Sequence, residues 1–376
     1  MIPYIVVFLI NFCLANQAEK TFFKKKGQCC ICLALIVVIN TIFVGLRNFG
    51  IGIDTLVYIN DYFNVARYIS VYKVFHNTGD MDVGFLLLAK IASWLSHDSQ
   101  MLLVLTELVI MGFIIFGLFE YKKTFPRLNF VWFLVLFSAA YYYHSENLMR
   151  QFCAMAAAFF AFSQYKQKKY LSYALFQVIA LSFHSTASLF FLVPIYDCIS
   201  GMNGKKKYGL ALVAFAVFIV AFVSYYYVIT MLGHFGIINE IYADRYGENS
   251  SIEGSSAKIG IRYVLEYLVP LFMIYYTKKK KVLSSSCFYM LFVLFISMLI
   301  FEQVRFISKY MYRLGFYFGL IYYAYMAMAL NTKKIAPFFK FLFVAFMYVD
   351  SYYAVIWLTN QAGIGGYEYA SKILGL

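Results

Sequence analysis

Long apolar runs separated by short polar stretches cover most of this chain. Stretches such as Leu33–Val44, Val131–Ala140 and Leu291–Phe301 are apolar on all sides, whereas the strands of a membrane barrel alternate apolar and polar residues. The pattern therefore predicts helices, and a helix needs about twenty residues to cross a bilayer. We predict twelve membrane spans, at 2–18, 29–46, 100–119, 128–143, 147–165, 169–183, 187–200, 208–231, 260–277, 283–301, 310–330 and 335–358.

Two segments depart from this simple pattern. A single helix over 169–200 would be about 46 Å long, well beyond the hydrocarbon core of about 30 Å, so we predict a hairpin of two short helices. Its tip, Ser182–Thr186, should lie below the outer surface, at the floor of a recess. The segment 83–96 has an apolar face but is too short to span, and we predict an interfacial or re-entrant helix on the outer side.

Composition supports a single integral membrane domain over residues 1–376. Of the 376 residues, 63% are hydrophobic and 21% aromatic but only 13% charged, and the mean hydropathy is +0.72. A soluble domain carries about 25% charged residues, so this chain has too little polar surface for a water-exposed globule. The expected class is all-α, a polytopic transmembrane bundle of about twelve helices. The first apolar run has no basic region before it, which indicates a retained helix rather than a signal peptide.

Lysines gather in the connections that one orientation of this bundle places on the cytoplasmic side. Cytoplasmic loops of membrane proteins are enriched in Lys and Arg, so both termini should lie outside. The net charge of +14 is then explained by loop anchors, and we expect no nucleic-acid partner. Of the 32 basic residues, 19 lie in six such clusters: Lys20 with Lys24–Lys26; Lys122, Lys123 and Arg127; Lys166, Lys168 and Lys169; Lys205–Lys207; Lys278–Lys281; and Lys333 with Lys334.

Arginines follow the opposite distribution, since only Arg127 of the eight falls inside in this topology. Arginine presents a planar fork that binds phosphate oxygens in pairs and keeps its proton, so an arginine-lined outer cavity predicts a phosphate or diphosphate ligand. Pairing with local carboxylates, or contact with lipid headgroups, is the alternative. We favour that alternative for Arg67, Arg245 and Arg262. We favour ligand binding for Arg47, Arg150, Arg305 and Arg313, whose neighbours are polar, aromatic or glycine-rich.

Three groups could exchange a proton at this outer site. They are His184 at the hairpin tip, Glu146 in an aromatic-rimmed loop and Asp54 in the first outer loop. A lone buried histidine is more often hydrogen-bonded than catalytic, but a place at the floor of an arginine-rimmed recess makes the two roles equally expected. The choice between base and binder among the three groups therefore stays open. The outer loops 47–82 and 232–259 border the site, and the second could close over it as a lid.

No metal or cofactor is predicted. The cysteines, including the run Cys29–Cys32, have no histidine at metal-ligand spacing and are typical of small buried apolar residues. Gly50 and Gly52 lack the third glycine and the preceding strand of a nucleotide-binding loop.

Five short stretches resemble the EpsG/Wzy-type polysaccharide (O-antigen) polymerases in content and order. The resemblance implies a GT-C-like glycosyltransferase of the bacterial inner membrane, with its active site facing the periplasm. Such an enzyme joins undecaprenyl-diphosphate-linked oligosaccharide repeats into O-antigen or exopolysaccharide, and needs neither a nucleotide sugar nor a metal. The stretches are Gly45–Thr55 with Tyr58, Asp82–Phe85 (where the family more often begins with Glu), Asn147–Gln151, Phe183–Thr186, and Arg305–Arg313.

The resemblance and the arginine pattern together suggest roles. Arg150 and Arg47 would hold the diphosphate and neutralise the charge that develops as it leaves, and Arg305 and Arg313 would bind the second lipid carrier or assist with the first. The partners implied are lipid-linked oligosaccharides, membrane lipids and a chain-length regulator protein. The expected acid–base residues are His184, Glu146 and Asp54, and the further substrate-binding residues are Gln151, Tyr58 and Tyr310.

Other membrane functions remain as alternatives. An O-antigen ligase shares the substrate and the side of the membrane. A lipid-linked oligosaccharide flippase also binds phosphate, but alternating access favours internal repeats and cationic sites open to both faces, and this chain has no convincing repeat. A membrane acyltransferase would need a catalytic histidine in a cytosol-facing motif. Polymerase is the favoured prediction.

Overall fold

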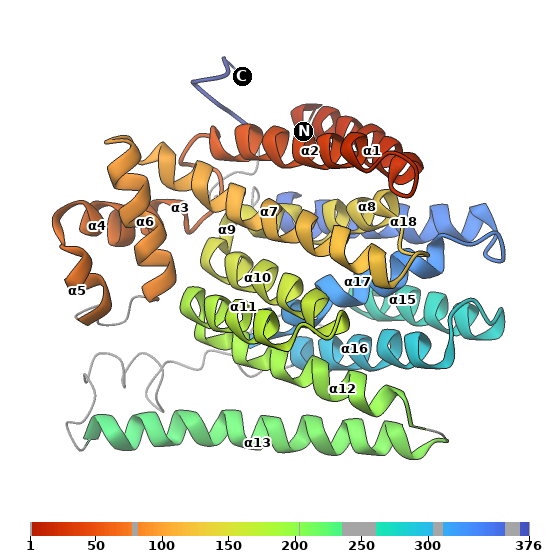
Figure 1. Ribbon diagram of the computed structural model, residues 1–376. Coiled ribbons are helices and arrows are strands. Elements are labelled where there is room, and N and C mark those ends of the chain that lie inside the picture. The colour runs from red at the N-terminus through yellow and green to blue at the C-terminus, as the bar shows by residue number, and fades with distance from the viewer. Residues whose placement is uncertain are drawn as a thin grey trace.

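The computed structural model describes residues 2–76, 82–202, 204–234, 261–303, 311–357 and 369–375, and for 221–234, 311 and 355–357 the backbone alone. Throughout these residues the secondary structure is helical (Figure 1). This confirms the predicted all-α class. Helices are expected in lipid because each one satisfies its own backbone hydrogen bonds.

The first half of the described chain forms long helices joined by a cluster of short ones. In Figure 1 the short helices α3 to α6 lie together at one end of the bundle. The elements are α1 (Ile2–Thr21), α2 (Lys26–Gly45), α3 (Thr55–Val57), the π-helix η1 (Tyr58–Asn64), α4 (Val65–Tyr68), α5 (Val71–His76), α6 (Val83–Leu95), α7 (Gln100–Thr124), α8 (Phe130–Ala140), α9 (Tyr142–Asn147) and α10 (Met149–Lys166).

The second half adds helices that run alongside these. In Figure 1, α13 lies at the edge of the bundle opposite α1 and α2. The elements are α11 (Tyr170–Phe183), the 3₁₀ helix η2 (Ser185–Phe191), α12 (Leu192–Ser200), α13 (Lys206–His234), α15 (Ile261–Lys279), α16 (Ser285–Gln303), the 3₁₀ helix η4 (Met311–Gly315), α17 (Phe316–Leu330), α18 (Pro337–Ser351) and the π-helix η5 (Tyr352–Trp357).

A central helix, α17, forms the core, since every one of its residues is buried. Helix α10 is also largely buried, and its alanines allow α7 and α11 to pack closely against it. On the periphery, large apolar side chains face outward, such as Ile2 of α1, which is 76% exposed, and Leu212 of α13, which is 60% exposed. An apolar periphery around an apolar core suits lipid as the solvent.

The lysine-bearing connections lie together at one end of the bundle, opposite α3 to α6 (Figure 1). There Lys122 of α7 forms an ion pair with Glu19 of α1 at 2.6 Å, and the Lys334 ammonium donates to the carbonyl of Lys281 at 3.3 Å. At the other end, the hydroxyl of Tyr369 donates to the carbonyl of Phe43, and the ring centres of Tyr4 and Tyr369 are 5.7 Å apart, so both terminal segments lie there. This sorting is the one that the predicted topology requires, and which end faces the cytoplasm stays a prediction from the positive-inside rule.

Each predicted span overlaps described helical residues, but 187–200, 310–330 and 335–358 each combine an α-helix with a 3₁₀ or π segment. Four helices, α1, α2, α7 and α16, are long and apolar enough to cross a membrane by length and composition, and several shorter apolar helices accompany them. The predicted break at the hairpin tip is present, because α11 ends at Phe183 and η2 begins at Ser185. Helix α6, at 13 residues, is as short as predicted. The predicted span 128–143 is instead interrupted: α8 ends at Ala140, and the short helix α9 follows.

Candidate functional site

The predicted first outer loop packs against the corner between α8 and α10. The backbone N–H of Asp54 donates to the side-chain oxygen of Asn147 at 2.7 Å. Gly52 has φ +83°, and a Cβ added there would lie 2.8 Å from the Glu146 carbonyl oxygen, so both conformation and space call for glycine. Two stretches predicted from sequence to share the outer site therefore lie in contact.

The buried side chain of Arg47 holds this loop in place through hydrogen bonds to backbone carbonyls. The residue is 1% exposed, and its guanidinium donates to the carbonyl oxygens of Val44 at 2.8 Å, Glu146 at 2.7 Å and Ile51 at 3.5 Å. A side chain so buried and so fully used by backbone acceptors cannot contact a lipid diphosphate without leaving its place. In this structure Arg47 organises the loop, and its predicted contact with a diphosphate stays a prediction.

Glu146 is also fully buried, at 0% exposure. One carboxylate oxygen accepts a hydrogen bond from the Tyr4 hydroxyl at 3.0 Å, and the other has no partner among the described residues. Burial raises the pKa of Glu146 to about 7, although Arg47 and the Tyr4 hydrogen bond act in the opposite direction. This placement does not support the predicted direct proton transfer from an acceptor, and we assign Glu146 to the same supporting layer as Arg47.

Glu146→Gln should stabilise the purified protein in a pH-dependent way. The pKa of Glu146 rises from 4.5 to about 7 on folding, so the folded wild type loses stability as pH rises through that interval. At pH 8 the loss is about 3 kcal/mol. The glutamine keeps an acceptor for Tyr4 but no charge. We expect its melting temperature to exceed that of the wild type by several degrees at pH 8 and by little at pH 5; an equal difference at both pH values contradicts the assignment.

Arg150 forms a second cluster, in the first turn of α10. Its Nη1 donates to the Asp82 carboxylate at 2.7 Å and to the Tyr62 hydroxyl. Its guanidinium lies over two rings of η1, 5.7 Å from the centre of Tyr58 and 5.1 Å from that of Tyr62. Arg150 is 22% exposed and Asp82 is 18% exposed, so the pair is accessible, unlike Arg47. Burial raises the pKa of Asp82 to about 6, and Arg150 limits that rise.

His184 lies at the break between α11 and η2, where the charge of Arg150 affects it. Its Nδ1 is buried and has no hydrogen-bond partner among the described residues. Burial, followed by the positive charges of Arg150 and Arg313, lowers the pKa of His184 to about 3, so the imidazole is neutral at physiological pH. Nearby, the Thr186 hydroxyl donates to that of Tyr317 in α17 at 2.9 Å, which fixes η2 against the core.

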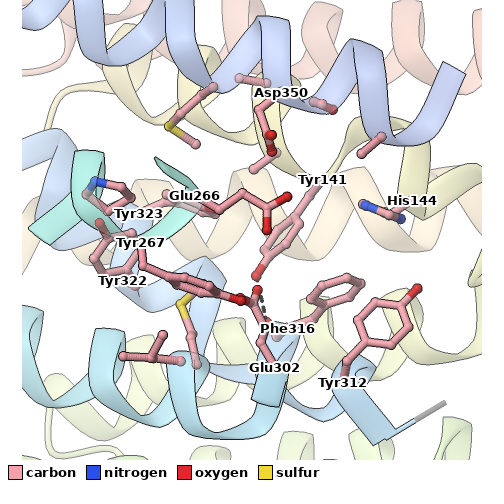
Figure 2. A pocket seen from close by; sticks show the side chains of 18 of the residues that line it. Tyr141, His144, Glu266, Tyr267, Glu302, Tyr312, Phe316, Tyr322, Tyr323 and Asp350 are labelled. Carbon is pink, nitrogen blue, oxygen red and sulfur yellow. Dashed lines mark hydrogen bonds between the residues drawn. The ribbon is translucent and has the colours of Figure 1, made fainter. Parts of the chain in front are cut away.

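A cavity of about 480 Å³, shown in Figure 2, lies near the Arg150 cluster. Arg313 is one of its lining residues. The Gln151 side chain, next to Arg150, donates to the carbonyl of Arg313 at 2.7 Å. His144, which also lines the cavity, has a pKa lowered to about 4 by burial and by the charge of Arg313. Gln151 thus has a structural partner here, alongside its predicted contact with substrate.

The cavity contains acidic residues that the sequence did not single out as a group. They come from three helices, Glu266 from α15, Glu302 from α16 and Asp350 from α18. Arg262 forms ion pairs with Glu266 and, at 2.7 Å, with Asp350, as expected of an arginine held by local carboxylates. Because these residues are far apart in sequence, no local motif could have revealed the cluster.

Several predicted features lie outside the described residues. These are Arg245, Arg305, Tyr310 and the lid segment, of which only residues 232–234 are described, as backbone. Within the described residues, no group of three or more His, Cys, Asp or Glu side chains is arranged to hold a metal ion.

Comparison with known proteins gives one match. The family model described as the EpsG family matches residues 30–371, nearly the whole chain. Comparison with curated proteins and with solved structures gives no significant match. The matched range includes the first outer loop, the α10 arginine and the hairpin tip. On this match, the chain belongs to the EpsG family, a family of Wzy-type polysaccharide polymerases.

Proposed function

We propose that the protein polymerises undecaprenyl-diphosphate-linked oligosaccharide repeat units into O-antigen or exopolysaccharide at the periplasmic face of the bacterial inner membrane. Membership of the EpsG family supports the polymerase activity in general. The observation that carries the finer proposal is Arg150, an accessible arginine at the start of α10, held over two tyrosine rings and beside His184.

In the proposed reaction, a hydroxyl oxygen of the incoming repeat attacks the anomeric carbon of the growing chain. A new glycosidic bond forms as the bond from that carbon to the diphosphate oxygen breaks. The electron pair of the broken bond goes to the lipid diphosphate, and the hydroxyl proton goes to a base. The diphosphate is already a good leaving group, so the protein's main task is to stabilise its developing charge.

Arg150 suits that task on three counts. A guanidinium binds phosphate oxygens in pairs and stays charged. The N-terminal end of α10, an 18-residue helix, adds its own partial positive charge. Asp82 and the two tyrosines hold the side chain in a defined orientation before the lipid arrives. Arg313, whose carbonyl accepts a hydrogen bond from Gln151, is the second proposed contact.

His184 is the proposed proton acceptor. Its neutral state leaves a lone pair available, and its Nδ1 has no competing partner among the described residues. Asp54, half-buried in the first loop, remains a proposed contact for a sugar hydroxyl.

Deletion of the gene tests the polymerase proposal against its rivals. A polymerase mutant should accumulate exported lipid-linked single repeats and make no long polymer. A flippase mutant would retain its repeats on the cytoplasmic face, and a ligase mutant would build long chains that stay on the lipid carrier. Either of these latter phenotypes, measured by mass spectrometry of extracted lipids, overturns the proposal.

A further inference from the structure

The cavity beside Arg313 differs in chemistry from the Arg150 cluster. Its lining residues include three carboxylates, those of Glu266, Glu302 and Asp350, against the two arginines Arg262 and Arg313. In Figure 2 the three carboxylates face the middle of the cavity from different helices. Because Arg262 is already paired with two of them, this lining suits a diphosphate less well than the Arg150 cluster does.

The same lining suits a saccharide. Carboxylate oxygens accept hydrogen bonds from several hydroxyl donors at once, and they do so strongly. Aromatic rings add apolar surface with a polar edge, and five tyrosines contribute to this lining. They are Tyr141, Tyr267, Tyr312, Tyr322 and Tyr323. The volume of about 480 Å³ lies within the usual range for small-molecule sites.

One hydroxyl in the lining is a candidate for contact with a ligand. Tyr322 is 2% exposed, and its hydroxyl has no hydrogen-bond partner among the described residues. A buried polar group without a partner is costly, so such groups are usually satisfied by water or ligand. By contrast, Tyr141 is satisfied internally, since its hydroxyl donates to the Phe316 carbonyl at 3.3 Å.

The cavity also adjoins the Arg150 cluster. Gln151, the neighbour of Arg150, donates to the carbonyl of Arg313, and Arg313 lines the cavity. Ile53 of the first loop and Asn147 of α9 line it as well, and the backbone N–H of the adjoining Asp54 donates to the side chain of Asn147. A saccharide in the cavity would therefore lie next to a diphosphate held at Arg150.

From these observations we propose that the cavity is the acceptor subsite, which binds the non-reducing end of the incoming repeat unit. This inference rests on the proposed polymerase function and assigns the donor diphosphate and the acceptor sugar to separate parts of the site. The arginine cluster holds the leaving diphosphate, and the acidic tyrosine-lined cavity holds and orients the sugar that attacks. Glu302 and Tyr322 are binding residues in this scheme.

Direct binding tests the subsite without requiring polymerisation. The probe is the repeat-unit oligosaccharide cleaved from the cell's own polymer and reduced, so that it cannot act as a donor. Binding to the purified protein is measured by saturation-transfer NMR. We expect Glu302→Gln to weaken binding on the order of tenfold and Tyr322→Phe by severalfold. The control Glu120→Gln, at the lysine end of α7, should leave binding unchanged.

A kinetic assay then separates acceptor from donor. A repeat unit on lipid diphosphate with its attacking hydroxyl blocked serves as donor, and an alkyl glycoside of the repeat serves as acceptor. Glu302→Gln should raise KM for the acceptor about tenfold and leave KM for the donor unchanged. A rise in the donor KM alone, equal binding by all variants or no binding by the wild type overturns the subsite. If the variants weaken saccharide binding as expected but the wild type makes no polymer, the saccharide site is upheld and the polymerase function is overturned.

Discussion

Arg150→Ala is expected to abolish polymer formation and leave cells with exported single repeats. The guanidinium at the start of α10 is the proposed partner of the departing diphosphate, and removal of one such group costs about 10²–10³ in rate. Arg150→Lys keeps the charge but not the planar fork, so we expect a partial loss. The measurement is the polymer ladder from cells that express each variant at equal membrane levels. Arg67→Ala, at an exposed arginine of α4, is the matched control and should leave the polymer ladder unchanged.

A structural role for Arg150 must be separated from a chemical one. Arg150→Ala alone leaves the largely buried Asp82 carboxylate without its ion-pair partner, which can destabilise the protein. The double variant Arg150→Ala with Asp82→Asn removes both charges and should fold, as judged by a monodisperse elution profile in detergent. We expect this variant to remain inactive. Long polymer from the folded double variant would show that Arg150 only balances Asp82.

His184→Gln should lower kcat by about 10²–10⁴ and leave KM nearly unchanged, because a glutamine fills the site but cannot accept the proton. The matched control is His97→Gln, at an exposed histidine in the turn before α7. The measurement is turnover of purified protein with a lipid-linked repeat. Wild-type kcat in a folded His184→Gln variant rules out His184 as the base.

The pH profile provides a second test of His184. In the free protein, burial and the charges of Arg150 and Arg313 hold the pKa of His184 near 3, so its protonation should not reduce kcat/KM between pH 5 and 8. A bound diphosphate offsets those two positive charges and should raise the pKa. The acid limb of kcat, which reports the enzyme–substrate complex, should therefore lie at higher pH than that of kcat/KM. Coincident limbs would contradict a base positioned beside the diphosphate.

Much of the fold could be predicted from hydropathy because lipid imposes length and apolarity on each helix. The prediction of a break in 169–200 rested on the length of the segment and on the lysine clusters at both of its ends, and the structure has that break at His184. The interruption at Tyr141 could not be predicted in this way. It depends on a hydrogen bond to Phe316, 175 residues away, and on Gly319, where an added Cβ would overlap the Tyr141 ring.

The site was predictable in its residues more than in their roles. The sequence indicated that Arg47 and Arg150 belong to the same outer site. It could not distinguish their roles, because both are arginines at predicted outer helix ends. Only the packing distinguishes them: the Glu146 carbonyl, 99 residues from Arg47, closes over that guanidinium, whereas Arg150 stays accessible beside Asp82. The acidic cavity gave no sequence signal, because its carboxylates come from three separate helices.

Reconstitution of the purified protein in liposomes tests the central claim most directly. The only substrate supplied is the lipid-diphosphate-linked repeat unit, with EDTA present and no nucleotide sugar. The proposed reaction predicts a ladder of two, three and more repeats, with one undecaprenyl diphosphate released for each new glycosidic bond. A protein that folds and binds the lipid yet yields only single repeats, or extends chains only when a nucleotide sugar is added, would contradict it.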